Sequence, residues 1–363
     1  MKIYVASFNF SPGHLSHLIA WYKLFTLVGY ETKLLLDYGY KNLIEKEFDV
    51  EYINSKLNDR FEVLKTDVLL IQNPSIKNHS LAKKFKEKGA KIVYIYHEPW
   101  DSWQEYLKEG VKQTFKASVA HFFSTKLLSL SDSIIVPSEF ALKLYEKRDF
   151  KCNSNVSVIP LIFDDETKDI ELTPKNKTYF SYIGTACKGH GFDEFLNLLL
   201  SFDKKDLIDL PFKFQISTKT DITNLMNEQI RFLIKEGFLK INHGKPLKNS
   251  EINQAYANSF AVWNLYNRST QSGVLPKAQM FGTAPIAFNI GSFPEFIQNG
   301  INGFLIKDYN FNNLKKTIYI AFENRKKLFE NCRSNFFQKF YFANYANEMK
   351  HIVENMFLSH DNC

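Results

Sequence analysis

The chain has 363 residues, of which 45% are hydrophobic, and a formal net charge of +7. At about 100–200 residues per domain, this length and apolar content exclude global disorder and predict two domains. The four cysteines are scattered without a Cys-x-x-Cys spacing, which argues against a zinc site or a disulfide framework and favours a reducing compartment.

The N-terminal sequence MKIYVASFNF is too polar for a signal peptide, and no window reaches the roughly 18 unbroken apolar residues of a membrane span. We therefore expect a cytoplasmic protein. A positive net charge suits phosphorylated ligands, anionic lipid or nucleic acid. Because the chain has no arginine-rich tract and no zinc finger, we expect no nucleic-acid partner.

Short apolar strands alternate with helices along the first half of the chain. Such unbroken apolar strands predict a parallel sheet that is covered on both faces. Helices are predicted after the first strand, ending at Gly29, and over 80–90 and 139–148. The predicted strands are 2–10, 31–37, 67–73, 91–96 and 131–138, and the apolar segment 155–163 closes this half.

A polar segment over 164–177 without apolar periodicity predicts a linker, and a second α/β unit follows it. We expect domains at 1–165 and 178–340, a linker at 166–177, and a C-terminal segment at 341–363. In the second unit, strands are predicted at 178–184, 212–218, 239–244 and 260–266, helices at 192–202, 226–237 and 250–259, and a last helix pair from about 312 to 357.

Two parallel-sheet domains predict a cleft at the carboxyl ends of their strands, where such sheets bind ligands. The stretch RSTQSGVLPKAQMFG follows an apolar strand and can begin a helix at Gly273. Free backbone N–H groups and the helix dipole would bind phosphate there, with Ser272 as a further donor and Arg268 and Lys277 as nearby cations. A strand–helix turn that binds nothing fits the same pattern.

Other loops after strands carry candidate ligand contacts. Lys188 and His190 lie in a glycine loop that suits a diphosphate, and Gly13 and His14 follow the first strand. Glu295 follows a proline in a turn, where its carboxylate would accept hydrogen bonds from ribose hydroxyls. Solvated turns explain each of these loops equally simply.

The sequence YHEPW ends the strand at 91–96 and places His97, Glu98 and Trp100 at a strand terminus. His97 would donate hydrogen bonds to a hydroxylated ligand, and Trp100 offers a stacking face for a sugar. A structural histidine is the alternative. The chain lacks the sequences GxSxG, HExxH, Walker A and a full GxGxxG, which gives little support to hydrolase, metalloprotease, P-loop or dinucleotide functions.

Together these motifs resemble the retaining nucleotide-sugar glycosyltransferases of family 4, which have the GT-B fold of two Rossmann-like domains. The segment FGTAPIAFNIGSFPEFIQNGINGFLI is similar to the family's run from a Gly-Lys/Thr-Pro step through Gly-Gly-x-Pro-Glu to Asn-Gly-x-Leu. SDSIIVPSEFALKLY and YIGTACKGHGFDEFL resemble the end of its first domain and the start of its donor domain. The resemblance implies that the tail from about Tyr341 crosses back to the N-domain.

The resemblance also implies roles for single residues. Gly13 would lie over the diphosphate, His97 near the reacting carbon, and Ser272 and Gly273 would meet the diphosphate or sugar through backbone amides. His190 takes the place of the family's donor-loop lysine. Two positions depart from the family pattern: Thr185 replaces an arginine, and the Glu-x7-Glu pair is replaced by Arg268 or Ser269 followed by Pro276 or Lys277.

The resulting prediction is transfer of a sugar from a nucleotide-diphosphate donor to a hydroxyl acceptor, with retention and without a metal or other cofactor. The resemblance implies a glycan or lipid-linked acceptor in bacterial capsule, O-antigen or lipooligosaccharide assembly, bound through His14, Glu98 and Trp100. Lysines and apolar residues over 106–128 suit either an anionic inner-membrane surface or a helix pair packed on the sheet. The alternatives are a catalytically silent scaffold and a GT-B-fold epimerase or phosphorylase.

Overall fold

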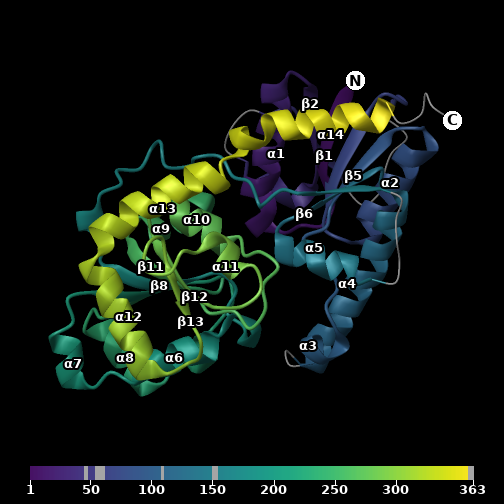
Figure 1. The fold of residues 1–363 in the computed structure, drawn as a ribbon. Coiled ribbons are helices and arrows are strands. Elements are labelled where there is room, and N and C mark those ends of the chain that lie inside the picture. Colours follow the sequence, from purple (N-terminus) through teal and green to yellow (C-terminus); the bar gives the residue numbers. More distant parts are fainter. Residues whose placement is uncertain (45–47, 54–61, 108–109, 149–153, 359–363) are drawn as a thin grey trace. The chain divides into compact units, whose positions relative to one another are not determined.

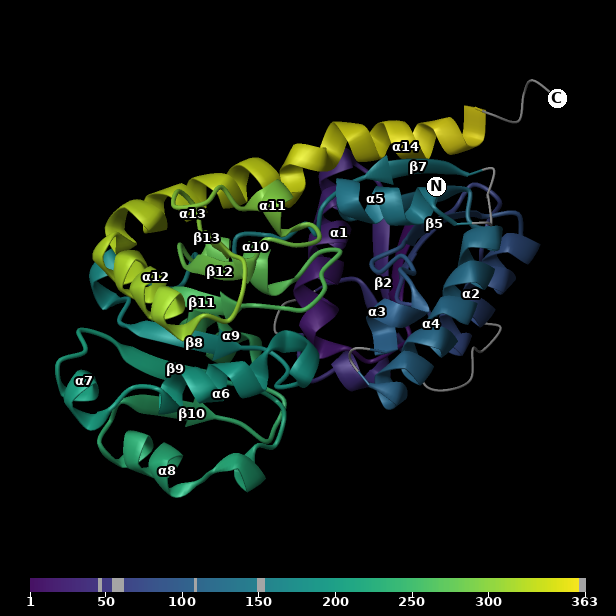
Figure 2. The ribbon, with the colours of Figure 1, turned by 60° about the horizontal axis from the view of Figure 1, so that its bottom comes forward.

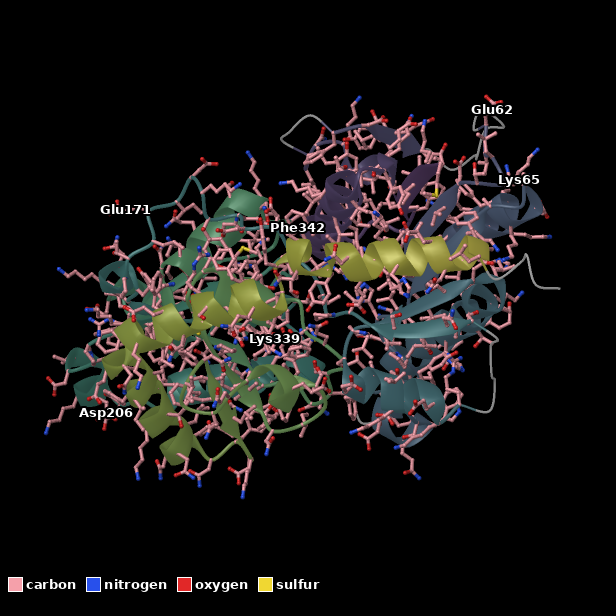
Figure 3. All side chains as sticks on the ribbon, turned by 45° about the horizontal axis from the view of Figure 1, so that its top comes forward. Glu62, Lys65, Glu171, Asp206, Lys339 and Phe342 are labelled. Carbon is pink, nitrogen blue, oxygen red and sulfur yellow. The ribbon has the colours of Figure 1, made fainter. Side chains whose placement is uncertain are left out.

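The computed structural model describes residues 1–44, 48–53, 62–107, 110–148 and 154–358. The chain divides into two compact units, Met1–Asp164 with Phe340–Cys363 as unit 1 and Asp165–Lys339 as unit 2 (Figure 1). The chain therefore leaves unit 1 once and returns to it. Figure 3 labels Lys339, the last residue of unit 2, and Phe342, just after the return.

Unit 1 contains a seven-stranded parallel sheet in the order β3-β2-β1-β4-β5-β6-β7. The central strands β4 and β5 are buried at every position, which is why their sequences are continuous apolar runs. The strands are β1 (Lys2–Ser7), β2 (Glu31–Asp37), β3 (Val50–Ile53), β4 (Val68–Gln72), β5 (Lys91–Ile95), β6 (Ser133–Val136) and β7 (Asn155–Val158).

Helices cover both faces of this sheet. On one face, α1 (Leu15–Val28) and the C-terminal α14 (Ala346–Leu358) share a buried apolar cluster with β1 and β2. On the other face lie α2 (Ile76–Glu87), α4 (Val111–Leu130) and α5 (Glu139–Glu146), and α3 (Trp103–Leu107) packs on α4. α1 ends where Gly29 adopts a left-handed φ of 96°, as its sequence predicted. No described helix is long and apolar enough to cross a membrane.

Unit 2 contains a six-stranded parallel sheet in the order β10-β9-β8-β11-β12-β13, and its helices are labelled in Figure 2. One apolar cluster, rich in phenylalanine, joins this sheet to α6, α8, α12 and α13. The strands are β8 (Tyr179–Ile183), β9 (Lys213–Ser217), β10 (Leu239–Asn242), β11 (Ser259–Asn264), β12 (Ala284–Phe288) and β13 (Phe304–Ile306). The helices are α6 (Phe192–Leu200), α7 (Lys204–Ile208), α8 (Glu228–Lys235), α9 (Asn249–Ala257), α10 (Val274–Met280), α11 (Phe293–Phe296), α12 (Phe311–Glu323) and α13 (Arg325–Lys339).

The polar segment over 165–177 lies within unit 2 and is held there by charged contacts. Arg333 binds the Asp165 carboxylate through two hydrogen bonds of 3.1 and 3.2 Å. Lys177 is fully buried, and burial lowers the pKa of its ammonium to about 7. That ammonium donates to three oxygens at 3.0–3.1 Å, namely Tyr256 O, Ser259 O and Thr283 Oγ1.

The predicted parallel α/β architecture is confirmed, and several elements differ from the prediction, with the strand β12 and the helix α7 among those that were not predicted. β3 and β13 were not predicted, because one is short and only half-buried and the other has three residues after a turn. The predicted last helix pair is three helices, since α12 ends at Glu323 and a 3-10 turn over Phe342–Tyr345 precedes α14. α14 belongs to unit 1 and contacts α1, so the C-terminal segment does return to the N-terminal unit.

The packing of α14 predicts a large stability effect at Met349, whose side chain is fully buried against unit 1. Met349→Ala should lower the free energy of unfolding of unit 1 by about 2–5 kcal/mol, because a large buried side chain is removed. The neighbouring exposed Lys350 provides the control, and Lys350→Ala should change stability by less than about 0.5 kcal/mol. Equal effects in denaturant unfolding would contradict this packing.

Candidate functional site

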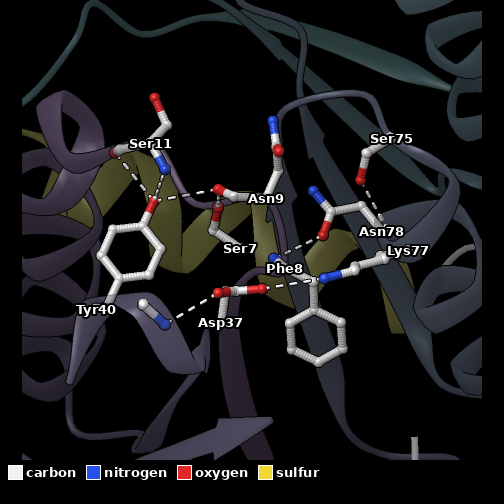
Figure 4. Close-up of polar contacts among 10 residues, drawn as sticks. Ser7, Phe8, Asn9, Ser11, Asp37, Tyr40, Ser75, Lys77 and Asn78 are labelled. Carbon is white, nitrogen blue, oxygen red and sulfur yellow. Dashed lines mark hydrogen bonds and ion pairs between the residues drawn. The ribbon is translucent and has the colours of Figure 1, made fainter. Parts of the chain in front are cut away.

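In unit 1, the loop after β1 is fixed by two side chains from other elements (Figure 4). The Tyr40 hydroxyl accepts from the Ser11 N–H at 2.9 Å and lies 3.0 Å from the Ser11 carbonyl. Asn78 accepts from the Phe8 N–H at 2.8 Å. These bonds hold the 3-10 turn Pro12–His14, and with it Gly13 and His14, at the carboxyl end of the sheet.

The ends of β4 and β5 bring polar side chains to the same edge. Asn73 donates its amide to His14 Nδ1 at 2.9 Å, and His97 Nε2 donates to Gln72 Oε1 at 3.2 Å. The rings of His14 and His97 have centroids 5.6 Å apart. Asn73 has a φ of 67°, the one positive φ of a non-glycine residue in the described part of the chain. Such backbone strain clusters at functional sites.

A third histidine, His17, lies beneath this pair, with its ring centroid 5.3 Å from that of His97. Its Nδ1–H donates to the Ile162 carbonyl at 2.9 Å, and its Nε2 accepts from the Trp21 indole at 3.1 Å. Both ring nitrogens are thus bonded in the neutral tautomer. Burial lowers the pKa of His17 to about 3.

His97 is also held neutral. Burial lowers its pKa well below the usual 6.5, and positive charge on His17 or His14 would oppose its protonation further. At neutral pH, His97 is therefore a hydrogen-bonding group without charge. It suits contact with sugar hydroxyls and does not suit an ion pair with phosphate.

Glu98 and Trp100, the other two candidate residues after β5, differ in their surroundings. Glu98 is exposed. The Trp100 ring stacks on Tyr106 at 4.4 Å between centroids and lies 4.6 Å from His121. These contacts explain Trp100 as a packing residue that anchors α3 on α4, so the predicted sugar-stacking role gains no support from the structure.

In unit 2, the loop after β8 packs closely on the loop after β11. Gly191 has a φ of 65°, and an added Cβ would lie 2.6 Å from the Tyr309 hydroxyl and 2.8 Å from the Leu265 carbonyl oxygen. The Trp263 indole donates to the His190 carbonyl at 3.0 Å, and the Asn267 N–H to the Gly189 carbonyl at 3.0 Å. The glycine loop is therefore fixed through its backbone carbonyls, which accept from the Asn267 N–H and from the Trp263 side chain.

The side chains of this glycine loop face in defined directions. The His190 ring stacks on Tyr266 with centroids 4.1 Å apart and planes at 15°. Its Nδ1 donates to the Thr185 carbonyl at 3.0 Å. Lys188 and Thr185 are exposed. His190 is thus oriented by its neighbours, whereas the Lys188 ammonium extends into solvent.

The loop between β11 and α10 uses its serine internally. The buried Ser272 hydroxyl donates to Asn264 Oδ1 at 3.2 Å and accepts from the Val274 N–H at 3.2 Å. Gly273 is exposed at the start of α10, and a Cβ there would meet nothing within 4 Å. The Ser272 hydroxyl thus has partners within its own loop and at the end of β11, its phosphate contact stays a prediction, and the Gly273 backbone is accessible.

Lys277 likewise has an internal partner. Its ammonium lies 3.1 Å from the Glu166 carboxylate and 2.6 Å from the Asn249 side-chain oxygen, in a buried position on α10. An internal ion pair therefore accounts for this lysine, which was predicted to supply charge to a phosphate. Arg268, in the loop before α10, is partly buried.

The loop after β12 contacts the loop after β11 through their backbones. Gly291 has a φ of 56°, and an added Cβ would lie 2.1 Å from the Ser269 carbonyl oxygen. The Ser292 N–H donates to that same oxygen at 3.1 Å. Glu295, on the short α11, is exposed. The loops after β8, β11 and β12 thus form one connected edge of unit 2.

Several polar residues of these edges were not identified from the sequence. Gln72 and Asn73 end β4, His17 lies in α1, and Asn264 ends β11. Gln72, Asn73 and Asn264 could have been identified from the sequence, because each is a polar residue at the end of a buried apolar strand. His17 offered no such signal, because it lies one turn inside a predicted helix.

Comparisons with known proteins identify the class of protein. Residues 164–338 match the family model described as Glycosyl transferases group 1, whereas no curated protein sequence matches the chain. Among similar solved structures, Anabaena HepE in complex with UDP and glucose is 14% identical, with 98% of this chain and 100% of that chain covered and a TM-score of 0.72. Sucrose-phosphate synthase from Thermosynechococcus elongatus is 12% identical, with 99% of each chain covered and a TM-score of 0.70. A glycosyltransferase from Rickettsia africae ESF-5 is 16% identical, with 98% of each chain covered and a TM-score of 0.67.

Two parallel α/β units that are similar over their whole length to these structures define the GT-B fold. Residues 164–338, which make up nearly all of unit 2, match the group 1 glycosyl transferases, in agreement with the family resemblance of the sequence. The chain is accordingly a glycosyltransferase of the nucleotide-sugar class.

The close approach of Gly291 predicts a steric requirement. Gly291→Ala should destabilise unit 2 by more than about 2 kcal/mol, because the new Cβ combines backbone strain with a clash. Gly300 is a matched control, since it has a φ of 76° with open space around it. Gly300→Ala should cost only about 1 kcal/mol. The prediction fails if both variants unfold at the same denaturant concentration.

The buried His17 predicts acid sensitivity. Its pKa is lowered in the folded protein, so the unfolded chain binds the proton first as the pH falls. The stabilisation is complete above pH 6.5 and is lost towards pH 3, by at most about 1.4 kcal/mol per pH unit.

Denaturant unfolding from pH 7 to pH 5 checks this prediction. His17→Gln keeps a donor and an acceptor without titrating and should reduce the pH slope. His351→Gln, at an exposed site in α14, should leave it unchanged. An unaltered slope in His17→Gln would show that this histidine does not titrate as described.

Proposed function

We propose that the protein transfers a sugar from a nucleotide-diphosphate donor to a hydroxyl of a glycan or lipid-linked acceptor, with retention at the anomeric carbon. The observation that carries the proposal is the connected edge of the three loops in the family-matched unit 2. It carries the accessible Gly273 backbone, the oriented His190 and the exposed Lys188 on loops that are tied together.

Buried polar atoms at this edge support a polar ligand. In the described residues, Asn264 Nδ2, Ser269 Oγ and Ser292 Oγ are buried and have no hydrogen-bond partner. Buried polar groups normally have one. The three atoms come from the end of β11 and from the loops after β11 and β12, so hydroxyls of a donor bound at this edge would provide the missing partners after small side-chain adjustments.

We assign the donor diphosphate to the accessible Gly273 backbone just before α10, with Lys188 and Arg268 as cations and Glu295 as the acceptor for ribose hydroxyls. Gly13 and His97 of unit 1 are assigned to the diphosphate and the transferred sugar. The acceptor oxygen attacks the anomeric carbon on the face that the diphosphate leaves, and its proton passes to the departing phosphate oxygen. Amides and cations aimed at that oxygen stabilise the growing charge.

The acceptor side is assigned to His14 and Glu98 in unit 1. A role in bacterial surface polysaccharide synthesis, at the cytoplasmic face of the inner membrane, is consistent with these assignments and rests on the family resemblance. The internal use of Ser272 and Lys277, together with the missing Glu-x7-Glu pair, favours a second candidate, a catalytically silent scaffold for another transferase.

Thermal unfolding against uridine, guanosine and adenosine diphosphates and their sugars tests the donor site. UDP-glucose comes first, because HepE was solved with that molecule. A nucleotide at about 100 times its Kd should stabilise the protein by roughly 2.7 kcal/mol. Gly273→Phe should abolish this shift without lowering the ligand-free midpoint, since the position is open.

Transfer assays separate the two candidate functions. If His97 contacts the transferred sugar, His97→Asn should bind the nucleotide as the wild type does and lose at least about 100-fold in donor turnover. Nucleotide binding without turnover by the wild type, with acceptor glycans supplied, would favour the scaffold. The absence of any nucleotide-induced shift would overturn the donor-site assignment.

A further inference from the structure

The surface of α4 in unit 1 carries an apolar stripe that no described residue covers. Val111, Phe115, Val119 and Phe122 are 78, 70, 43 and 54% exposed. At about 100° per residue, these four side chains fall within roughly 80° of the helix circumference. The opposite side of α4 packs Leu127 and Leu128 into the apolar cluster beneath the sheet. The helix is therefore apolar on two sides, and its own unit buries only one of them.

The short α3 extends this exposed surface. It packs on α4, as Figures 1 and 2 both show, and it exposes Trp103 and Leu107, which lie one helical turn apart. The contacts of Trp100 with Tyr106 and His121 fix α3 in this position. Large exposed aromatic and aliphatic groups on two adjoining helices mark an interaction site, because soluble surfaces rarely leave such patches uncovered.

The charged residues of α4 itself are all lysines. The sequence of α4 contains Lys112, Lys116 and Lys126 and no aspartate or glutamate. All three lysines are exposed, and on the helix circumference they lie within or beside the stripe. The Lys126 ammonium lies 4.5 Å from the Phe122 ring centroid. Phenylalanine and lysine therefore alternate on one surface.

The neighbouring helix α2 adds further positive charge. α2 packs on α4 and exposes Lys83 and Lys84. Burial, followed by the charges of Lys126 and Lys83, lowers the pKa of His79, which shows that ammonium groups of both helices act on the same place. The acidic groups of α2 and α3 are Glu87, which pairs with Lys83 at 3.7 Å, and Glu105. Lysines thus outnumber carboxylates over the three helices.

We propose that α3 and α4 form a docking surface for an anionic lipid bilayer, with the apolar stripe inserted at the headgroup boundary and the lysines against the lipid phosphates. The inference rests on the proposed function in so far as a lipid-linked acceptor would be reached from this surface. Charge complementarity selects the bilayer over a second copy of the chain, because a symmetric contact of this stripe would bring identical lysines together.

Sedimentation of the full chain with vesicles tests the proposal. The vesicles contain phosphatidylcholine alone or with about 30% phosphatidylglycerol, at low and high salt. The wild type should sediment with the anionic vesicles at low salt and stay in solution with the neutral ones. Phe115→Ser with Phe122→Ser, and separately Lys112→Glu with Lys116→Glu, should each reduce the bound fraction at least about fivefold.

Matched controls use exposed residues of unit 2. Ile208→Ser on α7 and Lys235→Glu on α8 should leave vesicle binding unchanged. All altered side chains are exposed, so the midpoints of thermal unfolding without lipid should agree with that of the wild type, which identifies any variant that fails to fold.

Two results would overturn the proposal. One is a wild type that stays in solution with anionic vesicles. The other is a chain that is dimeric by sedimentation velocity and that the Phe115/Phe122 variant converts to a monomer, because a second copy would then cover the stripe. Nucleotide binding is measured without vesicles, so the two proposals fail separately. A wild type that binds nucleotide and does not bind anionic vesicles rejects the docking surface alone. A wild type that binds anionic vesicles and does not bind nucleotide rejects the donor site alone.

Discussion

Backbone contact between loops that follow neighbouring strands is the constraint on which the candidate donor site depends. The chain has no side chain at Gly291, and this allows the Ser269 carbonyl to approach and to accept from the Ser292 N–H. Gly191 serves the same purpose between the loops after β8 and β11. Both contacts bring main-chain atoms of neighbouring loops together, and the side chains of Trp263 and Tyr309 add hydrogen bonds beside Gly191.

Unit 1 fixes its loops differently. Tyr40 and Asn78 reach the loop after β1 with their side chains, and Asn78 also donates to the carbonyls at the end of β4. Burial lowers the pKa of His17 and His97 there, so these two rings are uncharged at neutral pH. The two units therefore present different chemistry, with fixed amides and cations in unit 2 and neutral hydrogen-bonding rings in unit 1.

Much of the fold was predictable because it depends on local sequence. Unbroken apolar strands, helices between them and glycines after them give the parallel sheets and place the loops. The roles of Lys277, Ser272 and Trp100 were not predictable, because their partners are distant in the sequence or lie in elements whose packing was unknown. Glu166 is 111 residues from Lys277, and the sequence contains no pattern that pairs them. His17 was missed for the same reason, since Ile162 lies 145 residues away.

The return of the chain to unit 1 has a consequence for synthesis on the ribosome. Unit 2 is one continuous segment, whereas unit 1 needs α14, the last described helix, to cover the apolar face of α1. The first 164 residues therefore emerge with Trp21, Phe25 and their neighbours lacking a partner helix until unit 2 and then α14 have been made. Unit 2 has all of its strands before that point, so the second unit in the sequence is free to complete its fold first.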